Sequence, residues 1–288
     1  MRVLVTGAQG QLARSLAERA RRSRTVELVA VGRPKLELEV PASAEETIAA
    51  IAPDWVINAA AYTAVDDAEC DAERAFRINA EGAGAIAAAA AAVGAAIIQI
   101  STDYVFDGAA EQPYDETAKP NPLGVYGRSK LAGEEQVRLA NQRHLIVRTA
   151  WLYSPFGKNF VKTMMNAARS RDVLRVVDDQ RGSPTSAADL ADALFRMIEV
   201  GPRFGETYHV AGAGLASWHD FAQAIMDDCR RMGLPAAEVR PISSEKWPTR
   251  ALRPVNSALD SSKFALEFGG SPACWQHSLA EVIGRICS

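Results

Sequence analysis

The chain has 288 residues, far more than a domain needs to form a hydrophobic core without disulfides. Hydrophobic residues make up 48% and charged residues 23% of it, a composition that excludes a disordered or fibrous protein. The formal net charge of −3 provides no field strong enough to attract nucleic acid or an anionic membrane, so we expect neither as a partner.

The N-terminus runs directly into an expected strand, and no signal-peptide pattern precedes it, which predicts a cytoplasmic location. The longest apolar stretch, residues 82–98, is too short and too rich in Ala and Gly to span a bilayer. The cysteines show no paired-ligand spacing, so we expect reduced thiols and neither a disulfide framework nor a metal site: Cys70, Cys229, Cys274 and Cys287.

Short apolar runs rich in β-branched residues predict strands at residues 2–6, 26–31, 55–57, 96–100 and 145–149. Stretches of helical character alternate with them, at residues 12–22, 68–93 and 125–140. This alternation predicts an α/β protein with a Rossmann-type, doubly wound parallel sheet. In that architecture, ligands bind at the carboxyl ends of the strands.

The pattern loosens after Trp151, where eight prolines interrupt shorter helices and strands. We therefore predict a dinucleotide-binding domain over residues 1–150 and a smaller α/β substrate-binding region over residues 151–288. A helix at 187–199 and a strand at 207–210 could return to the sheet. We expect residues 186–210 to complete the first domain, which makes the substrate region discontinuous.

The first strand ends in a glycine-containing turn, Thr6-Gly7-Ala8-Gln9-Gly10-Gln11-Leu12-Ala13. Gly7 permits the tight turn, Gly10 lets the backbone approach a pyrophosphate, and the small Ala13 lets the helix pack closely on the strand. Amide groups at the helix start would face the phosphates. An ordinary strand-to-helix turn is the alternative, but the position after an N-terminal strand favours a dinucleotide site.

The second strand ends in Val31-Gly32-Arg33, where an acidic residue would bind a ribose 2′-hydroxyl. A guanidinium suits a 2′-phosphate, so Arg33 favours NADPH. Glu37 and Glu39 follow closely and could bind the ribose or adenine. NADH therefore remains possible, and the alternative interpretation of Arg33 is a solvated surface residue. We assign Glu37 and Leu38 to the cofactor site with Arg33.

Tyr126 and Lys130 are four residues apart and therefore on one face of a predicted helix. A phenol has a pKa of about 10, so a neighbouring ammonium must favour the phenolate if Tyr126 is to exchange protons near pH 7. Thr102 falls at the carboxyl end of the fourth strand and can donate a hydrogen bond to a carbonyl oxygen that accepts a hydride. A half-exposed Tyr/Lys pair and a loop-capping Thr are the alternative interpretation.

These residues together resemble the extended short-chain dehydrogenase/reductase family, and within it the dTDP-4-dehydrorhamnose reductases. Four blocks agree in order and the similarity extends to residues 253–257: Asn58-Ala59-Ala60-Ala61-Tyr62-Thr63-Ala64-Val65-Asp66, Ser101-Thr102-Asp103-Tyr104-Val105-Phe106-Asp107-Gly108, Arg148-Thr149-Ala150-Trp151-Leu152-Tyr153 and Asp179-Gln180-Arg181-Gly182-Ser183-Pro184-Thr185. The resemblance implies NAD(P)H-dependent reduction of the 4-keto group of dTDP-4-dehydro-L-rhamnose to dTDP-L-rhamnose, the last step in making that activated sugar.

The resemblance also implies roles for individual residues. The catalytic set would be Thr102, Tyr126 and Lys130. The cofactor would contact Gly7, Gly10, Gln11, Leu12, Ala61, Tyr62 and Thr63, and Lys130 would bind the nicotinamide ribose. The sugar nucleotide would contact Thr102, Asp103 and Trp151, with Asn159 and Arg253 near its diphosphate. Trp151 is otherwise a core residue and Arg253 a surface charge.

Some members of this family dimerise through Mg²⁺ held by glutamates, one of them on the first helix, but this chain has Ser15 at the matching place. We therefore expect a monomer or a homodimer without a bridging metal. Two other functions remain open at this stage: a nucleotide-sugar epimerase or dehydratase with the same chemistry, and a cofactor-binding regulatory subunit without turnover.

Overall fold

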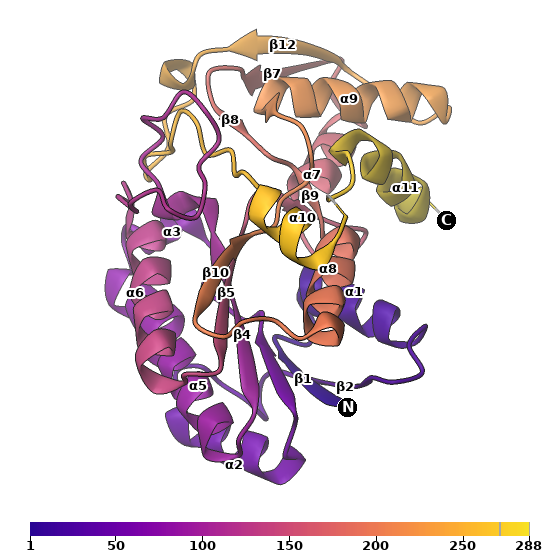
Figure 1. Cartoon of the computed structure of the whole chain (residues 1–288). Coiled ribbons are helices and arrows are strands. Elements are labelled where there is room, and N and C mark those ends of the chain that lie inside the picture. The colour runs from indigo at the N-terminus through magenta and orange to yellow at the C-terminus, as the bar shows by residue number, and fades with distance from the viewer. Residues whose placement is uncertain (271, 288) are drawn as a thin grey trace.

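The computed structural model describes residues 1–270 and 272–287 (Figure 1). Its centre is a six-stranded sheet in which every neighbouring pair is parallel, in the order β10-β5-β4-β3-β1-β2. The strands are β1 (Arg2–Thr6), β2 (Glu27–Val31), β3 (Trp55–Asn58), β4 (Ala96–Thr102), β5 (His144–Thr149) and β10 (Glu206–His209). The predicted Rossmann-type doubly wound sheet is confirmed.

Both faces of the sheet are covered by helices because successive strand residues point to opposite faces. Val3 and Val5 pack in one core with α1 (Gln11–Ala20) and α8 (Ala187–Val200). Leu4, between them, packs in a second core with α2 (Pro41–Ile51), α5 (Gly82–Ala92) and α6 (Val125–Ala140). Figure 1 shows the two helix layers on either side of the strands.

The single helix expected over residues 68–93 is interrupted. The chain forms α3 (Val65–Ala68), α4 (Ala72–Phe76), a π-helical segment η1 (Arg77–Glu81) and then α5. In η1 the backbone approaches α6 so closely that a Cβ on Gly133 would lie 2.0 Å from the carbonyl oxygen of Asn79. Only a glycine at position 133 lets the wider turn of η1 pack there.

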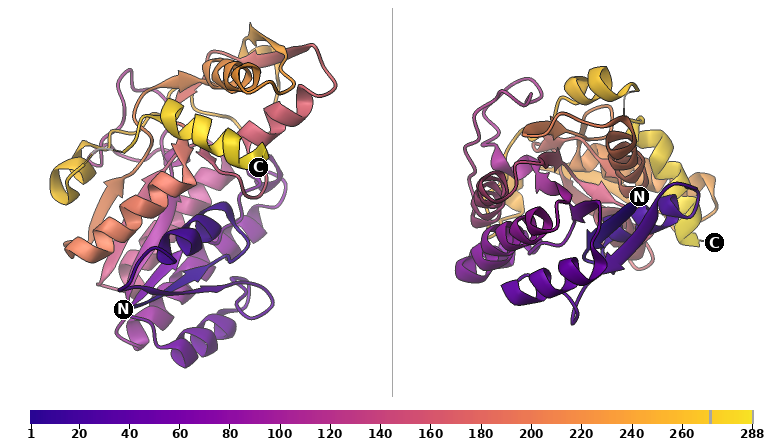
Figure 2. Two further views of the ribbon diagram at one scale, coloured as in Figure 1. Left: turned by 90° about the vertical axis from the view of Figure 1, so that its right-hand side faces the viewer. Right: turned by 60° about the horizontal axis from the view of Figure 1, so that its bottom comes forward.

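The rest of the chain lies beyond the carboxyl ends of the sheet strands, at the top of Figure 1 (see also Figure 2). It contains α7 (Phe160–Ala167), α9 (Trp218–Arg231), α11 (Trp275–Cys287) and the parallel pair β7 (Val173–Val177) and β12 (Glu238–Ile242). These elements enclose their own core, which includes Val161, Phe221, Ile225 and Leu279.

The remaining elements are short: β6 (Leu152–Tyr153), β8 (Arg181–Gly182), β9 (Thr185–Ser186), β11 (Ala216–Ser217), α10 (Ser262–Phe268) and the 3₁₀ turns η2 (Asp103–Val105) and η3 (Ser244–Lys246). The chain returns to the central sheet at β10, next to β5, after α8. α10 also belongs with this sheet, because Phe264 and Phe268 are buried in the core of α1 and α8. Within the described residues, no helix combines the length and the apolar character needed to cross a bilayer.

Candidate active site

The glycine turn between β1 and α1 has the geometry of a phosphate cradle. Gly7 adopts φ 75°, in the left-handed region, and a Cβ there would lie 3.2 Å from the backbone of Ala60. The Gly10 amide donates to the Gly7 carbonyl oxygen at 2.7 Å, and Gly10 begins α1 without a side-chain cap. The first amides of α1 are therefore free to bind an anion where backbone and ligand approach closely.

Two predicted cofactor residues, Gln11 and Leu12, follow this turn, and their side chains point in different directions. The Leu12 side chain is buried in the sheet core, so only its backbone amide faces the cradle. The Gln11 side chain points to the C-terminal part instead, because its Oε1 accepts hydrogen bonds from Ser154 Oγ and Asn159 Nδ2, both at 2.9 Å. Gln11 thus joins the cradle to the loop that precedes α7.

The end of β2 lies against the same turn. The Ala8 amide donates to the Val31 carbonyl oxygen at 3.1 Å, and a Cβ on Gly32 would lie 3.2 Å from the Ala8 nitrogen. Arg33 comes next and is exposed, while Glu37 and Leu38 are half-buried. This arrangement leaves the Arg33 guanidinium free to meet a charged group of a ligand that enters the cradle.

The segment after β3 carries Ala61, Tyr62 and Thr63, and Asn79 of η1 holds it in place. The Tyr62 amide donates to Asn79 Oδ1 at 2.8 Å, and Asn79 Nδ2 donates to the Tyr62 carbonyl oxygen at 3.1 Å. Asn79 Nδ2 also donates to Ser129 Oγ on α6 at 2.9 Å. No sequence signal singles out Asn79, because charged residues such as Arg77 and Glu81 surround it in the same helical stretch.

Thr102 and Tyr126 lie together at the carboxyl end of β4. Thr102 Oγ1 accepts from the Tyr104 amide at 3.2 Å and donates to Asp103 Oδ1 at 3.0 Å. Burial, opposed by the neighbouring Thr102 hydroxyl and assisted by the Asp103 charge, raises the pKa of Tyr126 to about 12. The Tyr104 ring stands edge-on to the Tyr126 ring, with centroids 6.0 Å apart.

Lys130 lies one helical turn after Tyr126 and is 4% exposed. Its Nζ donates to the Ile100 carbonyl oxygen at 2.6 Å. Burial lowers its pKa to about 8, while the charge of Glu134 raises it. The expectation that Lys130 acidifies Tyr126 is therefore wrong for this structure, because burial dominates both side chains and the ammonium is directed to a backbone carbonyl.

Two of the expected substrate contacts carry unusual features. Burial raises the pKa of Asp103 to about 7, against hydrogen bonds from Ser257 and Thr102, and Asp103 Oδ2 has no hydrogen-bond partner among the described residues. Trp151 adopts φ 45°, which is rare for a bulky residue, and its ring stacks on Trp218 with centroids 3.4 Å apart. An unpaired buried oxygen and a strained aromatic residue both occur preferentially at ligand sites.

The other two expected substrate contacts lie apart from each other. Asn159 caps α7 by accepting from the Lys162 amide at 3.2 Å, and its amide group binds Gln11. Arg253 forms a two-pronged ion pair with Asp66, at 2.7 and 3.2 Å. The structure thus places Asn159 at the phosphate cradle, whereas Arg253 lies beside the segment that follows β3.

The comparisons with known proteins cover almost the whole chain. The model of the RmlD substrate binding domain matches residues 1–287. A dTDP-4-dehydrorhamnose reductase of Sinorhizobium fredii is 41% identical over 288 residues, which cover 98% of this chain and 97% of that protein.

Two crystal structures extend the agreement to three dimensions. The dTDP-4-dehydrorhamnose reductase of Clostridium acetobutylicum has a TM-score of 0.94 at 41% identity, with all of both chains covered. The enzyme of the same name from Bacillus anthracis, in complex with NADP, has a TM-score of 0.91 at 36% identity and 98% coverage of both chains. The resemblance found in the sequence is confirmed, and the chain belongs to the family of the dTDP-4-dehydrorhamnose reductases.

Proposed function

We propose that this chain reduces the 4-keto group of dTDP-4-dehydro-L-rhamnose to give dTDP-L-rhamnose, with NADPH as the reductant. Membership of the reductase family supports the reaction. The observation that carries it is the meeting of Thr102 and Tyr126 at the carboxyl end of β4, with Lys130 one turn further along α6.

The residues around the cradle fit a dinucleotide. The backbone of Gly7, Gly10, Gln11 and Leu12 would hold the pyrophosphate, since a Cβ at either glycine would meet backbone atoms at 3.1 to 3.2 Å. Arg33 would bind the 2′-phosphate, and Glu37 and Leu38 would line the adenosine. Ala61, Tyr62 and Thr63 would contact the cofactor after β3, and Lys130 would bind the nicotinamide ribose. The relative from Bacillus anthracis in complex with NADP supports this choice of cofactor.

The catalytic residues would act on the oxygen of the keto group. When bound, NADPH supplies a hydride to the sugar C4. Thr102 would turn its single hydroxyl proton from Asp103 Oδ1 to the carbonyl oxygen. Tyr126 would give that oxygen a proton, which leaves a phenolate that regains its proton from solvent. The raised pKa of Tyr126 suits this direction, because the phenol is fully protonated at neutral pH before the reaction begins.

The sugar nucleotide would enter between the sheet and the C-terminal part. Asp103 Oδ2, which has no partner among the described residues, would accept a hydrogen bond from a sugar hydroxyl. Trp151 would contact the sugar, and Arg253 would lie near the diphosphate. Asn159 would contribute there only if its bonds to Gln11 and to α7 rearrange.

We also propose that the two parts of the chain bind different ligands. Residues 1–150, completed by residues 186–210, would bind the dinucleotide, because α8 and β10 pack on this sheet. The remaining residues between 151 and 288 would bind the sugar nucleotide, because Trp151 and its stacking partner Trp218 pack against the core of this part.

The test mixes the purified protein with NADPH and the 4-keto sugar nucleotide and follows the nicotinamide absorbance near 340 nm. We expect the absorbance to fall and the product to be dTDP-L-rhamnose by mass and NMR. A folded protein that binds NADPH without oxidising it would point to a regulatory subunit and refute the proposal. A protein that retains NAD⁺ through purification and interconverts sugar epimers would refute it in favour of an epimerase.

A further inference from the structure

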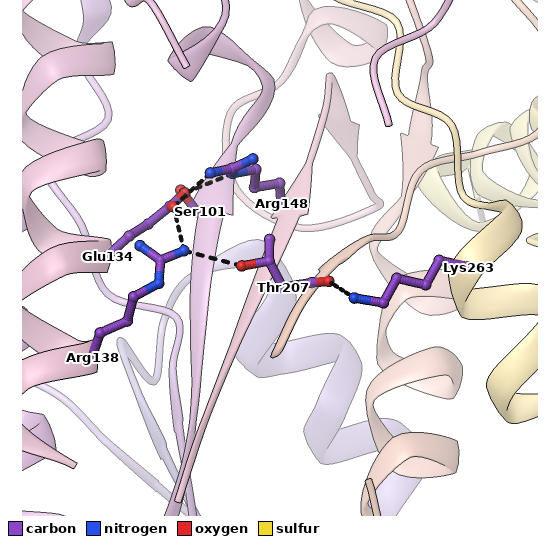
Figure 3. A network of polar contacts seen from close by, with 6 residues as sticks. All are labelled: Ser101, Glu134, Arg138, Arg148, Thr207 and Lys263. Carbon is purple, nitrogen blue, oxygen red and sulfur yellow. Dashed lines mark hydrogen bonds and ion pairs between the residues drawn. The ribbon is translucent and has the colours of Figure 1, made fainter. Parts of the chain in front are cut away.

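A buried carboxylate lies behind the catalytic residues, on the same helix. Glu134 follows Lys130 by one turn of α6, and its side chain is fully buried. Figure 3 shows Glu134 reaching from α6 to the strands of the sheet. Helical residues four apart lie on one face, so Glu134 and Lys130 both face the sheet.

Four hydrogen bonds converge on this carboxylate. Ser101 Oγ of β4 donates to Oε1 at 2.6 Å, and Arg148 of β5 donates to both oxygens, at 2.9 and 2.8 Å. Arg138 donates to Oε2 at 3.2 Å and to Thr207 Oγ1 of β10 at 3.0 Å. Glu134 is thereby tied directly to β4 and β5, and through Arg138 to β10, and a buried carboxylate with this many donors has a fixed position.

The same strand segment holds both Glu134 and Lys130. Lys130 Nζ donates to the carbonyl oxygen of Ile100, and the next residue, Ser101, donates to Glu134. Thr102 follows directly and is the residue at the reacting carbonyl in the proposed mechanism. The Glu134 contacts therefore fix where α6 lies relative to Thr102, and with it the positions of Tyr126 and Lys130.

Glu134 is also the anion next to the Lys130 ammonium. Burial alone would raise the pKa of Glu134, but the hydrogen bonds and charge of Arg148, with Ser101 and Arg138, hold it below its ordinary value. The carboxylate is therefore ionised at neutral pH. Its charge opposes the lowering of the Lys130 pKa by burial.

The other ionisable groups around this part of α6 do not replace that anion. Towards the sheet they are Tyr126, Asp103 and Arg148, and His209 of β10, whose pKa burial lowers to about 4. On the outer side, α5 has no charged residue. The charged groups of α3, α4 and η1 are exposed, are paired with other residues, or accept a hydrogen bond from the first amide of α6: Asp66, Asp67, Glu69, Glu73, Arg74, Arg77 and Glu81.

We propose that Glu134 is a positioning residue of the active site, which holds Lys130 in place and keeps it protonated through a buried network with Ser101 and Arg148. This inference rests on the proposed function. In the proposed site the Lys130 ammonium binds the nicotinamide ribose, so the network sets the upper pH limit of cofactor binding and, with it, of the reaction.

Glu134→Gln removes the charge but leaves Arg148 buried without a counter-ion, which by itself can prevent folding. The decisive variant therefore combines Glu134→Gln with Arg148→Met, because replacing both members of a buried pair restores charge balance. We measure kcat/KM against pH and, independently of turnover, the affinity for NADPH against pH by nicotinamide fluorescence. Near-ultraviolet circular dichroism checks the fold.

In the wild type, both profiles should fall on the alkaline side near pH 8, where Lys130 loses its proton. In the double variant this fall should move to lower pH, with the rate at about pH 8 reduced about tenfold more than the rate at about pH 6. The matched control is Arg138→Met, which removes a hydrogen-bond donor from the same carboxylate but keeps the anion. Its alkaline fall should stay at the wild-type pH or move higher.

A folded double variant with an unchanged alkaline fall would overturn the inference. So would a downward shift of equal size in Arg138→Met, which would mean that any damage to the network suffices. The two proposals fail in different ways. If the wild type does not oxidise NADPH with the 4-keto sugar, the proposed function is wrong, whereas the pH profile of NADPH affinity still tests Glu134.

Discussion

Burial keeps the hydroxyl of Tyr126 protonated, because a phenolate in this site would lack the solvation that water provides. Burial raises the pKa of Tyr126 to about 12, and Thr102 is the neighbouring group that opposes the rise. Tyr126→Phe removes the proton while keeping the ring. We expect kcat to fall by about 10² or more and the dissociation constant for NADPH to stay within about threefold. Stopped-flow turnover and NADPH fluorescence measure the two, and a variant of near-normal kcat would identify another acid.

Asp103 makes a residue-scale prediction about stability and pH. Its pKa is raised from 3.8 to about 7 by burial, so the folded chain holds this proton more tightly than the unfolded chain does. The wild type therefore loses stability as the pH rises from about 4 to about 7, by about 1.4 kcal/mol for each unit of pKa difference. Asp103→Asn lacks this loss, and its advantage in unfolding free energy should grow over that range and then level off. Parallel stability curves from urea unfolding would contradict the assignment.

Arg33 tests the choice of cofactor. The guanidinium is exposed directly after β2, beside the cradle, so its removal should change the affinity for one phosphate group and little else. We expect Arg33→Ala to raise KM for NADPH about tenfold, the value of one charge-assisted hydrogen bond, and to leave KM for NADH unchanged. An equal rise for both cofactors would mean that Arg33 does not contact the 2′-phosphate.

At the scale of elements, the contact of η1 with α6 depends on a missing side chain. A Cβ on Gly133 would lie 2.0 Å from the Asn79 carbonyl oxygen, so Gly133→Ala must push η1 away from α6. We expect it to lower the free energy of unfolding by about 1 to 3 kcal/mol. The control is Gly284→Ala on α11, where a Cβ meets no atom within 4 Å and alanine should be neutral or stabilising. Equal effects of the two substitutions on urea unfolding would argue against the clash.

The elements also show where sequence patterns suffice. Residues 125–140 are predicted as a helix and form α6 with the same bounds, and the five predicted strands of the first 150 residues are all present. The regular alternation of strands and helices carries this information. The π-helical segment η1 could not be predicted, because an alanine-rich stretch has the same sequence periodicity whether one of its turns is α-helical or π-helical.

Single buried polar residues could not be predicted from the sequence for a related reason. Asn79 and Glu134 each lie among other polar residues on a helix, where such residues ordinarily face water, and only the packed structure shows that these two are buried. The motif residues Thr102 and Tyr126 were predictable because they are tied to local signals, a strand end and a Tyr/Lys spacing. The pKa values were not, since burial by distant segments decides them.

At the scale of the whole molecule, the nucleotide-binding sheet is completed from the second half of the chain. β10 pairs with β5, and Tyr208 is buried in the core that also contains Leu145 and Val147. A truncated chain of residues 1–150 would expose the edge of β5 and the apolar face that α8 covers. We expect such a fragment to aggregate or bind a hydrophobic dye, whereas the full chain stays monodisperse in sedimentation. A soluble fragment that binds NADPH would contradict this.

The late position of β10 also has a consequence for synthesis. A nascent chain has made the cradle, Thr102, Tyr126 and Lys130 long before His209 leaves the ribosome, yet the edge of β5 stays open until then. The order of translation therefore delays completion of the nucleotide-binding sheet. We expect this enzyme to depend on chaperones that cover the unpaired strand edge while the chain is still being synthesised.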